Sequence, residues 1–124
     1  MADPVSEWVE KAEEDYRVSL ALRRLRRQPA HNAVCFHAQQ CLEKYLKAIL
    51  QKECVAISKI HALPVLLDQC AVHHPLLAVM RPDMVRLSAY AVEFRYPGES
   101  ANEDDAKSAV DIMKRSRHDF RQIV

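Results

Sequence analysis

Apolar residues recur at steps of three and four along most of this chain, the spacing that lines one face of an α-helix. This spacing predicts a first helix from about Pro4 to Arg27, which ends where Gln28-Pro29-Ala30 interrupts it. The apolar face of this helix is formed by Trp8, Val9, Ala12, Tyr16, Leu20 and Leu22. Acidic residues fill its first half and an arginine cluster within residues 23–27 ends it, so the charges at both ends complement the helix dipole.

A second helix is predicted from about His31 to Lys52, and it carries two adjacent apolar rows. The rows are Val34, Ala38, Cys41, Tyr45 and Ala48, beside Cys35, Leu42, Leu46 and Ile49. Because the apolar band is so wide, we expect this helix to be the most buried. A polar stripe occupies the rest of its surface and consists of His37, Gln40, Lys44, Lys47 and Gln51.

Three shorter segments complete the pattern. Residues from about His61 to Val72 predict a third helix, and residues from about Pro82 to Phe94 predict a fourth, with a short turn between them. The last helix is expected to follow the capping-box sequence Ser100-Ala101-Asn102-Glu103 and to run to about Ile123. Helices joined by short links pack antiparallel, so we expect an all-α, up-and-down four-helix bundle with a short extra helix.

Composition supports this fold. The chain has 124 residues and one glycine, and it shows no alternation typical of strands. A chain of this length forms one domain, taken here as residues 1–124, and scarce glycine disfavours sheets and phosphate-cradling loops. The net charge of +1 provides no global field that would attract a nucleic acid. Any nucleic-acid binding must therefore come from a local cluster of charges.

The remaining sequence signals concern compartment and metals. No segment reaches the eighteen or more apolar residues of a membrane span, so we expect no membrane association. The four cysteines are scattered and lack the density of a disulfide framework, which favours the cytoplasm. Neither a Cys-x-x-Cys pair nor a His-Glu-x-x-His motif occurs, and we expect neither a metal site nor a cofactor.

The second helix also carries a recognisable string, CFHAQQCLEKYLKAIL at residues 35–50. This string resembles the signature of HEPN domains. Three further pieces of the chain agree with that family in order and approximate spacing. They are Asp15-Tyr16, His61-Ala62-Leu63, and Tyr90 followed by Arg95-Tyr96-Pro97.

The resemblance implies a bundle of four to five helices that forms homodimers. Many prokaryotic members of the family stand beside a minimal nucleotidyltransferase as one half of a toxin–antitoxin pair. Some members are metal-independent ribonucleases, and others are described as nucleotide binders. We therefore expect a homodimeric HEPN-domain protein that binds nucleotide or RNA and a cognate nucleotidyltransferase.

The polar stripe of the second helix is the first candidate binding site. Lysines offer point charges to phosphate, while His37 and Gln40 can hydrogen-bond a base or ribose. The candidate nucleotide-binding residues of the stripe are His37, Gln40, Lys44 and Lys47. An equal alternative is that the stripe is a polar helix edge that pairs with acidic residues of a neighbouring helix, such as Asp15 or Glu14.

Arg95-Tyr96-Pro97 is the second candidate. Arg95 can neutralise a phosphate and Tyr96 can stack on a base. The alternative is that this segment anchors a turn, with Tyr96 packed and Arg95 bonded to carbonyl groups at a helix end.

The ribonuclease members carry an arginine separated from a histidine by four to six residues. The histidine acts as general base on a ribose 2′-hydroxyl, and the arginine stabilises the charge on the phosphate. After Arg95 no histidine stands at the expected place, because residues 100–102 are serine, alanine and asparagine. The spacing recurs from Arg24 or Arg26 to His31, where four closely spaced arginines make a chance match easy. Catalysis is thus open, with Arg26 and His31 as its candidates, and a structural dimerisation module without ligand is a further alternative.

Overall fold

The computed structural model describes residues 3–124, and residues 1 and 2 of the predicted domain lie outside the described part. Every regular element among the described residues is helical, as the sequence predicts. The elements are α1 (Pro4–Arg23), α2 (His31–Lys52), α3 (Leu63–Ala71), the short 3₁₀ helix η1 (Pro75–Met80), α4 (Arg81–Glu93) and α5 (Glu103–Arg121).

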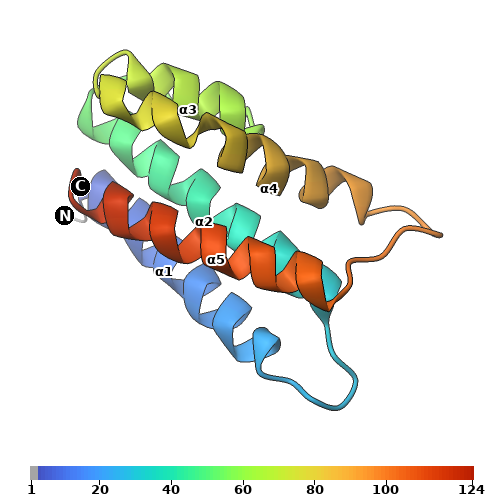
Figure 1. Ribbon diagram of the computed structural model, residues 1–124. Helices are drawn as coiled ribbons and strands as arrows, with labels where there is room; N and C mark the ends of the chain where they lie inside the picture. Colours follow the sequence, from blue (N-terminus) through green and yellow to red (C-terminus); the bar gives the residue numbers. More distant parts are fainter. Residues whose placement is uncertain (1–2) are drawn as a thin grey trace.

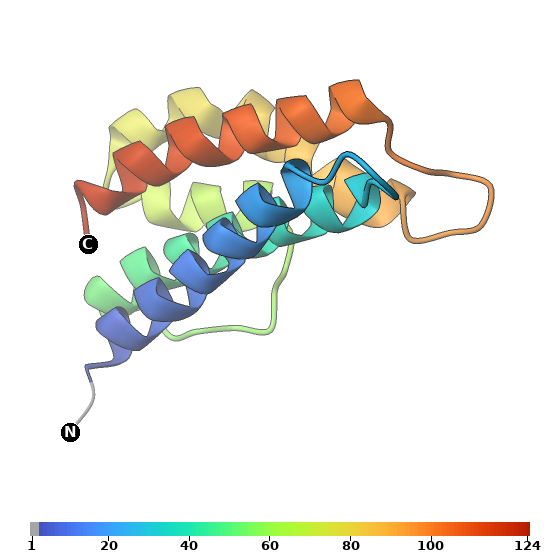
Figure 2. The same cartoon turned by 90° about the horizontal axis from the view of Figure 1, so that it is seen from below.

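The four long helices α1, α2, α4 and α5 alternate in direction along the chain and form a bundle (Figure 1). The connection over residues 53–62 runs back along the bundle before α3 begins (Figure 2). Helix α3 then packs against α2 and α4, and η1 joins it to α4. This arrangement confirms an up-and-down four-helix bundle with a short extra helix.

Helix α2 is the centre of the bundle and contacts α1, α3, α4 and α5. Most of its 22 residues are buried, which confirms the prediction from its wide apolar band. The largest side chains of the core include Tyr45 of α2 and Phe120 of α5, whose ring centroids lie 6.5 Å apart. Helix α5 contributes five buried apolar residues to the core, namely Ala106, Ala109, Val110, Met113 and Phe120.

Several helix ends differ from the prediction. Helix α1 ends at Arg23 rather than near Arg27, and the connection that follows includes Gln28 with a left-handed φ of 50°. The last helix is capped by Asn102 and Asp105, whose side chains bond each other's backbone N–H groups, and not by Ser100 and Glu103. Sequence periodicity locates helix interiors better than helix ends, since local caps compete there.

A partly buried cluster of charged and polar side chains joins three helices. The Glu13 carboxylate of α1 accepts hydrogen bonds from Tyr45 Oη at 2.6 Å, Arg117 Nε at 2.7 Å and Arg121 Nη1 at 2.9 Å. The Arg117 guanidinium also lies 4.0 Å from the centroid of the Tyr16 ring. The hydrogen bond from Arg117 lowers the pKa of Glu13, with the Tyr45 bond acting in the same direction. Glu13 thus ties α1 to both α2 and α5.

No helix within residues 3–124 carries an apolar stretch long enough to cross a lipid bilayer.

Candidate functional site

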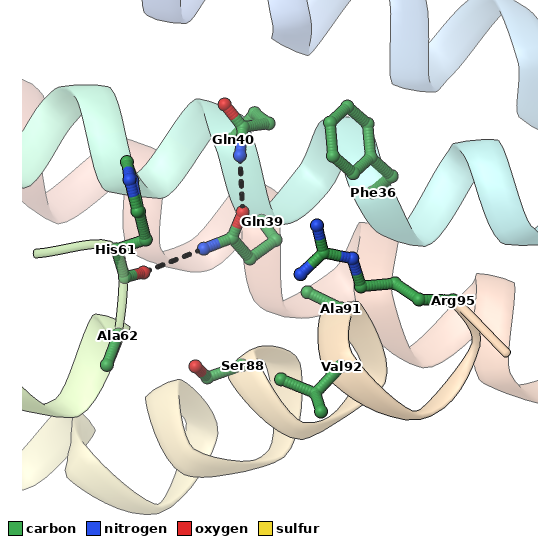
Figure 3. A pocket seen from close by; sticks show the side chains of 9 residues that line it. All are labelled: Phe36, Gln39, Gln40, His61, Ala62, Ser88, Ala91, Val92 and Arg95. Carbon is green, nitrogen blue, oxygen red and sulfur yellow. Dashed lines mark hydrogen bonds between the residues drawn. The ribbon is translucent and has the colours of Figure 1, made fainter.

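A pocket of about 350 Å³ opens between α2, α4 and the start of α3 (Figure 3). Its volume falls in the range of roughly 300–1,000 Å³ common for small-molecule sites. The polar side of the pocket is formed by Gln39, Gln40, His61, Ser88 and Arg95. The apolar side is formed by Phe36, Ala62, Ala91 and Val92. We call this the α2–α4 pocket.

A chain of hydrogen bonds fixes the amides at one wall of the α2–α4 pocket. Gln39 Nε2 donates to the His61 carbonyl at 3.1 Å and to Glu43 Oε1 at 3.4 Å. Because both of those partners only accept hydrogen bonds, the Gln39 oxygen must face Gln40, whose Nε2 donates to it at 2.9 Å. Gln40 is left with its own oxygen and a second N–H hydrogen for a ligand, in an orientation set by its neighbours (Figure 3).

The opposite part of the pocket joins a charge to an aromatic ring. Arg95 follows α4 and its guanidinium reaches over Ala91 into the pocket, facing the wall formed by Gln39 and Phe36 (Figure 3). Phe36 is 47% exposed, which is unusual for an aromatic side chain on the central helix. Within residues 3–124 no carboxylate lies within 4.0 Å of Arg95, whereas Arg81 and Arg117 are both paired with one. An exposed ring and a cation with no acidic partner therefore share one pocket.

His37 and Lys44 lie on the other side of the polar stripe and face α1. Asp15 Oδ1 lies 2.8 Å from His37 Nδ1, and Asp15 Oδ2 accepts a hydrogen bond from Lys44 Nζ. Asp15 itself is buried, with 7% of its surface exposed. The pairing with Asp15 is the one named in the structural alternative for this stripe, and neither side chain lines the α2–α4 pocket.

Lys47 is also engaged within the bundle. It is 5% exposed, its Nζ donates to Glu43 Oε2 at 3.2 Å, and it lies 5.6 Å from the centroid of the Trp8 ring. The same Glu43 oxygen lies 3.1 Å from Nδ1 of the exposed His61. The charge of Lys47 is therefore balanced inside the bundle and does not reach the pocket.

Tyr96 follows the pocket residue Arg95 but is 64% exposed and is not part of the lining. Of the six residues expected to bind a nucleotide, the structure thus brings together two, Gln40 and Arg95, in one pocket. Phe36, Gln39 and Ser88 also line the pocket, although the sequence pattern does not mark them as site residues. An available signal was the position of Phe36, an apolar residue outside both apolar rows of α2.

A second hollow, of about 660 Å³, opens where the end of α1 and the start of α2 meet the start of α5. Three arginines and one histidine of its lining come from the first connection and its flanks, and they are Arg23, Arg24, Arg26 and His31. The rest of the lining is Leu25, Pro29 and Glu103. We call it the arginine hollow. It contains both members of the Arg26 and His31 match.

Within the described part of the chain, no group of three or more histidine, cysteine or carboxylate side chains is arranged to hold a metal ion. Cys35, Cys41 and Cys70 are free thiols in the core, where burial raises their pKa, to about 12 for Cys35 and Cys70. Cys54 is a free thiol at the surface.

Comparison with known proteins agrees with this fold. The family model of the HEPN domain matches residues 5–122. A crystal structure of an archaeal HEPN homologue superposes with a TM-score of 0.77 and 20% sequence identity, covering 99% of this chain and 100% of that one. No curated protein matches the sequence significantly. Since the family model spans nearly the whole bundle, including the helix with the polar stripe and both hollows, the chain belongs to the HEPN domain family.

Proposed function

We propose that this HEPN domain binds a nucleotide or RNA in the α2–α4 pocket. The observation that carries the proposal is the meeting of an exposed aromatic ring, an arginine without an acidic partner and an oriented amide in one pocket. Phe36 can stack on a base, Arg95 can neutralise a phosphate, and Gln40 can hydrogen-bond a base edge or ribose. Lys44 and His37 pair with Asp15 and have no direct contact with the ligand in this proposal.

Binding is tested by titrating the purified protein with the four nucleoside monophosphates and with a short single-stranded RNA, using calorimetry. The Gln40→Ala/Arg95→Ala variant is expected to bind about tenfold more weakly, a loss of about 1.4 kcal/mol. Phe36→Leu retains an apolar side chain but removes the ring, so a loss of about 1–3 kcal/mol isolates base stacking. Arg81→Ala is the matched control, because Arg81 lies on the same helix as the pocket wall and pairs with Asp68. Absence of binding by the intact protein to all of these ligands would refute the proposal.

The family resemblance also supports the existence of protein partners for this chain. We propose that the chain forms a homodimer and associates with a minimal nucleotidyltransferase as one half of a toxin–antitoxin pair. Light scattering after gel filtration tests the dimer, and an adjacent nucleotidyltransferase reading frame whose product co-purifies with the chain tests the pair. A monomer at all concentrations measured, with no such neighbour, contradicts this part and leaves the pocket proposal standing.

One observation favours ribonuclease activity as a second candidate function. Arg26 and His31 line the same hollow, although the sequence motif expected after Arg95 lacks its histidine. His31 would act as general base on a 2′-hydroxyl, and Arg26 would bind the adjacent phosphate. Cleavage of RNA in the presence of EDTA, abolished by His31→Ala, would support this function. Cleavage that persists in His31→Ala would exclude these two residues, and intact RNA with the unmodified protein would exclude the activity.

A further inference from the structure

The arginine hollow is a second positive surface at the same end of the bundle as Arg95. The connections over residues 24–30 and 94–102 lie at that end (Figure 1). The second connection is held to the first turn of α2 by a hydrogen bond of 2.7 Å from the Ala101 N–H to Asn32 Oδ1. The hollow opens between α1 and α5, whereas the α2–α4 pocket opens on the other side of α2. The two sites are therefore separate in lining and close in the fold.

The charges of the hollow are largely uncompensated. Arg24 and Arg26 are exposed, and within residues 3–124 neither has a carboxylate within 4.0 Å. Arg23 contacts one, Glu103, at 3.8 Å, but the Glu103 side chain is 76% exposed, so this ion pair is weak. Elsewhere on the surface, Arg81 and Arg115 are each paired with an aspartate at 3.1 Å. The hollow thus gathers guanidinium groups that the protein itself leaves available.

The backbone adds to this positive field. His31, a lining residue, is the first residue of α2, so the positive end of the α2 dipole lies at the hollow. The N-cap residue of α2 is Ala30, which has no side-chain acceptor, and the first turn contains no acidic residue. Helix α5 starts nearby with three acidic residues in its first turn, of which Glu103 lines the hollow opposite the three arginines Arg23, Arg24 and Arg26, so the lining keeps a positive balance. The arginines supply most of the charge, and the helix end strengthens it.

We propose that the arginine hollow binds phosphate groups of an RNA strand whose base occupies the α2–α4 pocket. This inference rests on the proposed function and decides between its two ligands, because a mononucleotide in the pocket has no phosphate left for a second site across α2. Guanidinium groups form paired hydrogen bonds with phosphate oxygens in a way that suits a polyphosphate backbone. The ligand is therefore a strand of several nucleotides.

The test compares ligands of increasing length by fluorescence anisotropy at several salt concentrations. The ligands are a labelled mononucleotide and a labelled single-stranded RNA of about 12 nucleotides. The variant is Arg24→Gln/Arg26→Gln, and the control is Arg81→Gln/Arg115→Gln, which removes the same charge from paired arginines. We expect the hollow variant to bind the long RNA about tenfold more weakly and the mononucleotide unchanged. For the hollow variant and the long RNA, the slope of log affinity against log salt concentration becomes less steep by about 0.7 per lost phosphate contact, or about 1.4 for two contacts.

Each outcome separates the hollow from the pocket. Gln40→Ala/Arg95→Ala weakens both ligands if the pocket binds the nucleotide, whereas the hollow variant weakens only the strand. Equal losses in the hollow variant and in the control would overturn the inference, as would an unchanged salt slope. Tripolyphosphate that competes with RNA for the wild-type protein but not for the Arg24→Gln/Arg26→Gln variant supports phosphate as the recognised group. An acidic peptide of equal charge that competes better than RNA would show a protein partner and refute the assignment to RNA.

Discussion

Replacement of Glu13 by glutamine tests how the bundle is held together. The side chain of Glu13 is 20% exposed and accepts hydrogen bonds from Tyr45, Arg117 and Arg121. Glutamine retains the shape and one acceptor oxygen but removes the negative charge and offers an N–H group to donors. The variant therefore removes charge assistance without creating a large cavity.

The expected loss follows from these contacts. The Arg117 pair is bidentate and partly buried, so its charge-assisted bonds contribute about 1.5–3 kcal/mol. The Arg121 side chain is 46% exposed, and its ion pair adds less than about 1 kcal/mol. The Tyr45 hydroxyl keeps an acceptor in the variant and so contributes little to the difference. We expect Glu13→Gln to lower the free energy of unfolding by about 2 kcal/mol.

The effect must also depend on pH. Because the folded-state pKa of Glu13 is lowered, chiefly by the Arg117 hydrogen bond, its stabilisation is complete above the unfolded pKa of about 4.3 and disappears as the pH falls through the folded pKa. Urea unfolding followed by circular dichroism at about pH 7 and about pH 3 measures this, with the exposed neighbour Glu14→Gln as control. The difference in the free energy of unfolding between the wild type and Glu13→Gln should become smaller in acid. A loss at neutral pH no larger than that of the control, or a gap that is independent of pH, would refute the reasoning.

Two further predictions concern the core. At about pH 8, a thiol reagent should label Cys54 within the mixing time. It should label Cys35, Cys41 and Cys70 only when the protein opens, because burial shields these thiols and raises their pKa. Mass spectrometry measures the order in which the four cysteines are labelled, and equal rates for all four would contradict the prediction. Leu42→Ala, at a fully buried position of α2, should lower the free energy of unfolding by about 2–5 kcal/mol in urea, and a loss below about 1 kcal/mol would show that the core relaxes around the cavity.

Local patterns were sufficient for the fold. Apolar residues spaced three and four positions apart, together with scarce glycine, predict helices. Helices with one wide apolar face must pack on one another. The centrality of α2 followed from its two apolar rows, because a helix with such a band needs neighbours on several sides. The helix ends followed less well, since capping by Asn102 or departure at Arg23 depends on a few competing side chains.

The site depended on tertiary structure. The members of the stripe lie on one side of α2, but they have different partners, because α1 brings the carboxylate of Asp15 only to His37 and Lys44. Lys44 meets Asp15 across the helix pair, whereas Gln40 stays open beside Arg95, which is 55 positions later in the chain and is brought there by α4. A helical period assigns a residue to a face but not to its partner across the bundle.

The sequence by itself therefore determined the helices, their burial and the family likeness, all of which depend on residues near one another in the chain. Only the tertiary structure decided which polar groups are neutralised inside the protein and which remain available to a ligand. The physical reason is that the charge of a side chain such as Lys44 is neutralised only by groups within a few ångströms, here Asp15 of α1. Those groups are distant in sequence, and packing of the helices selects them.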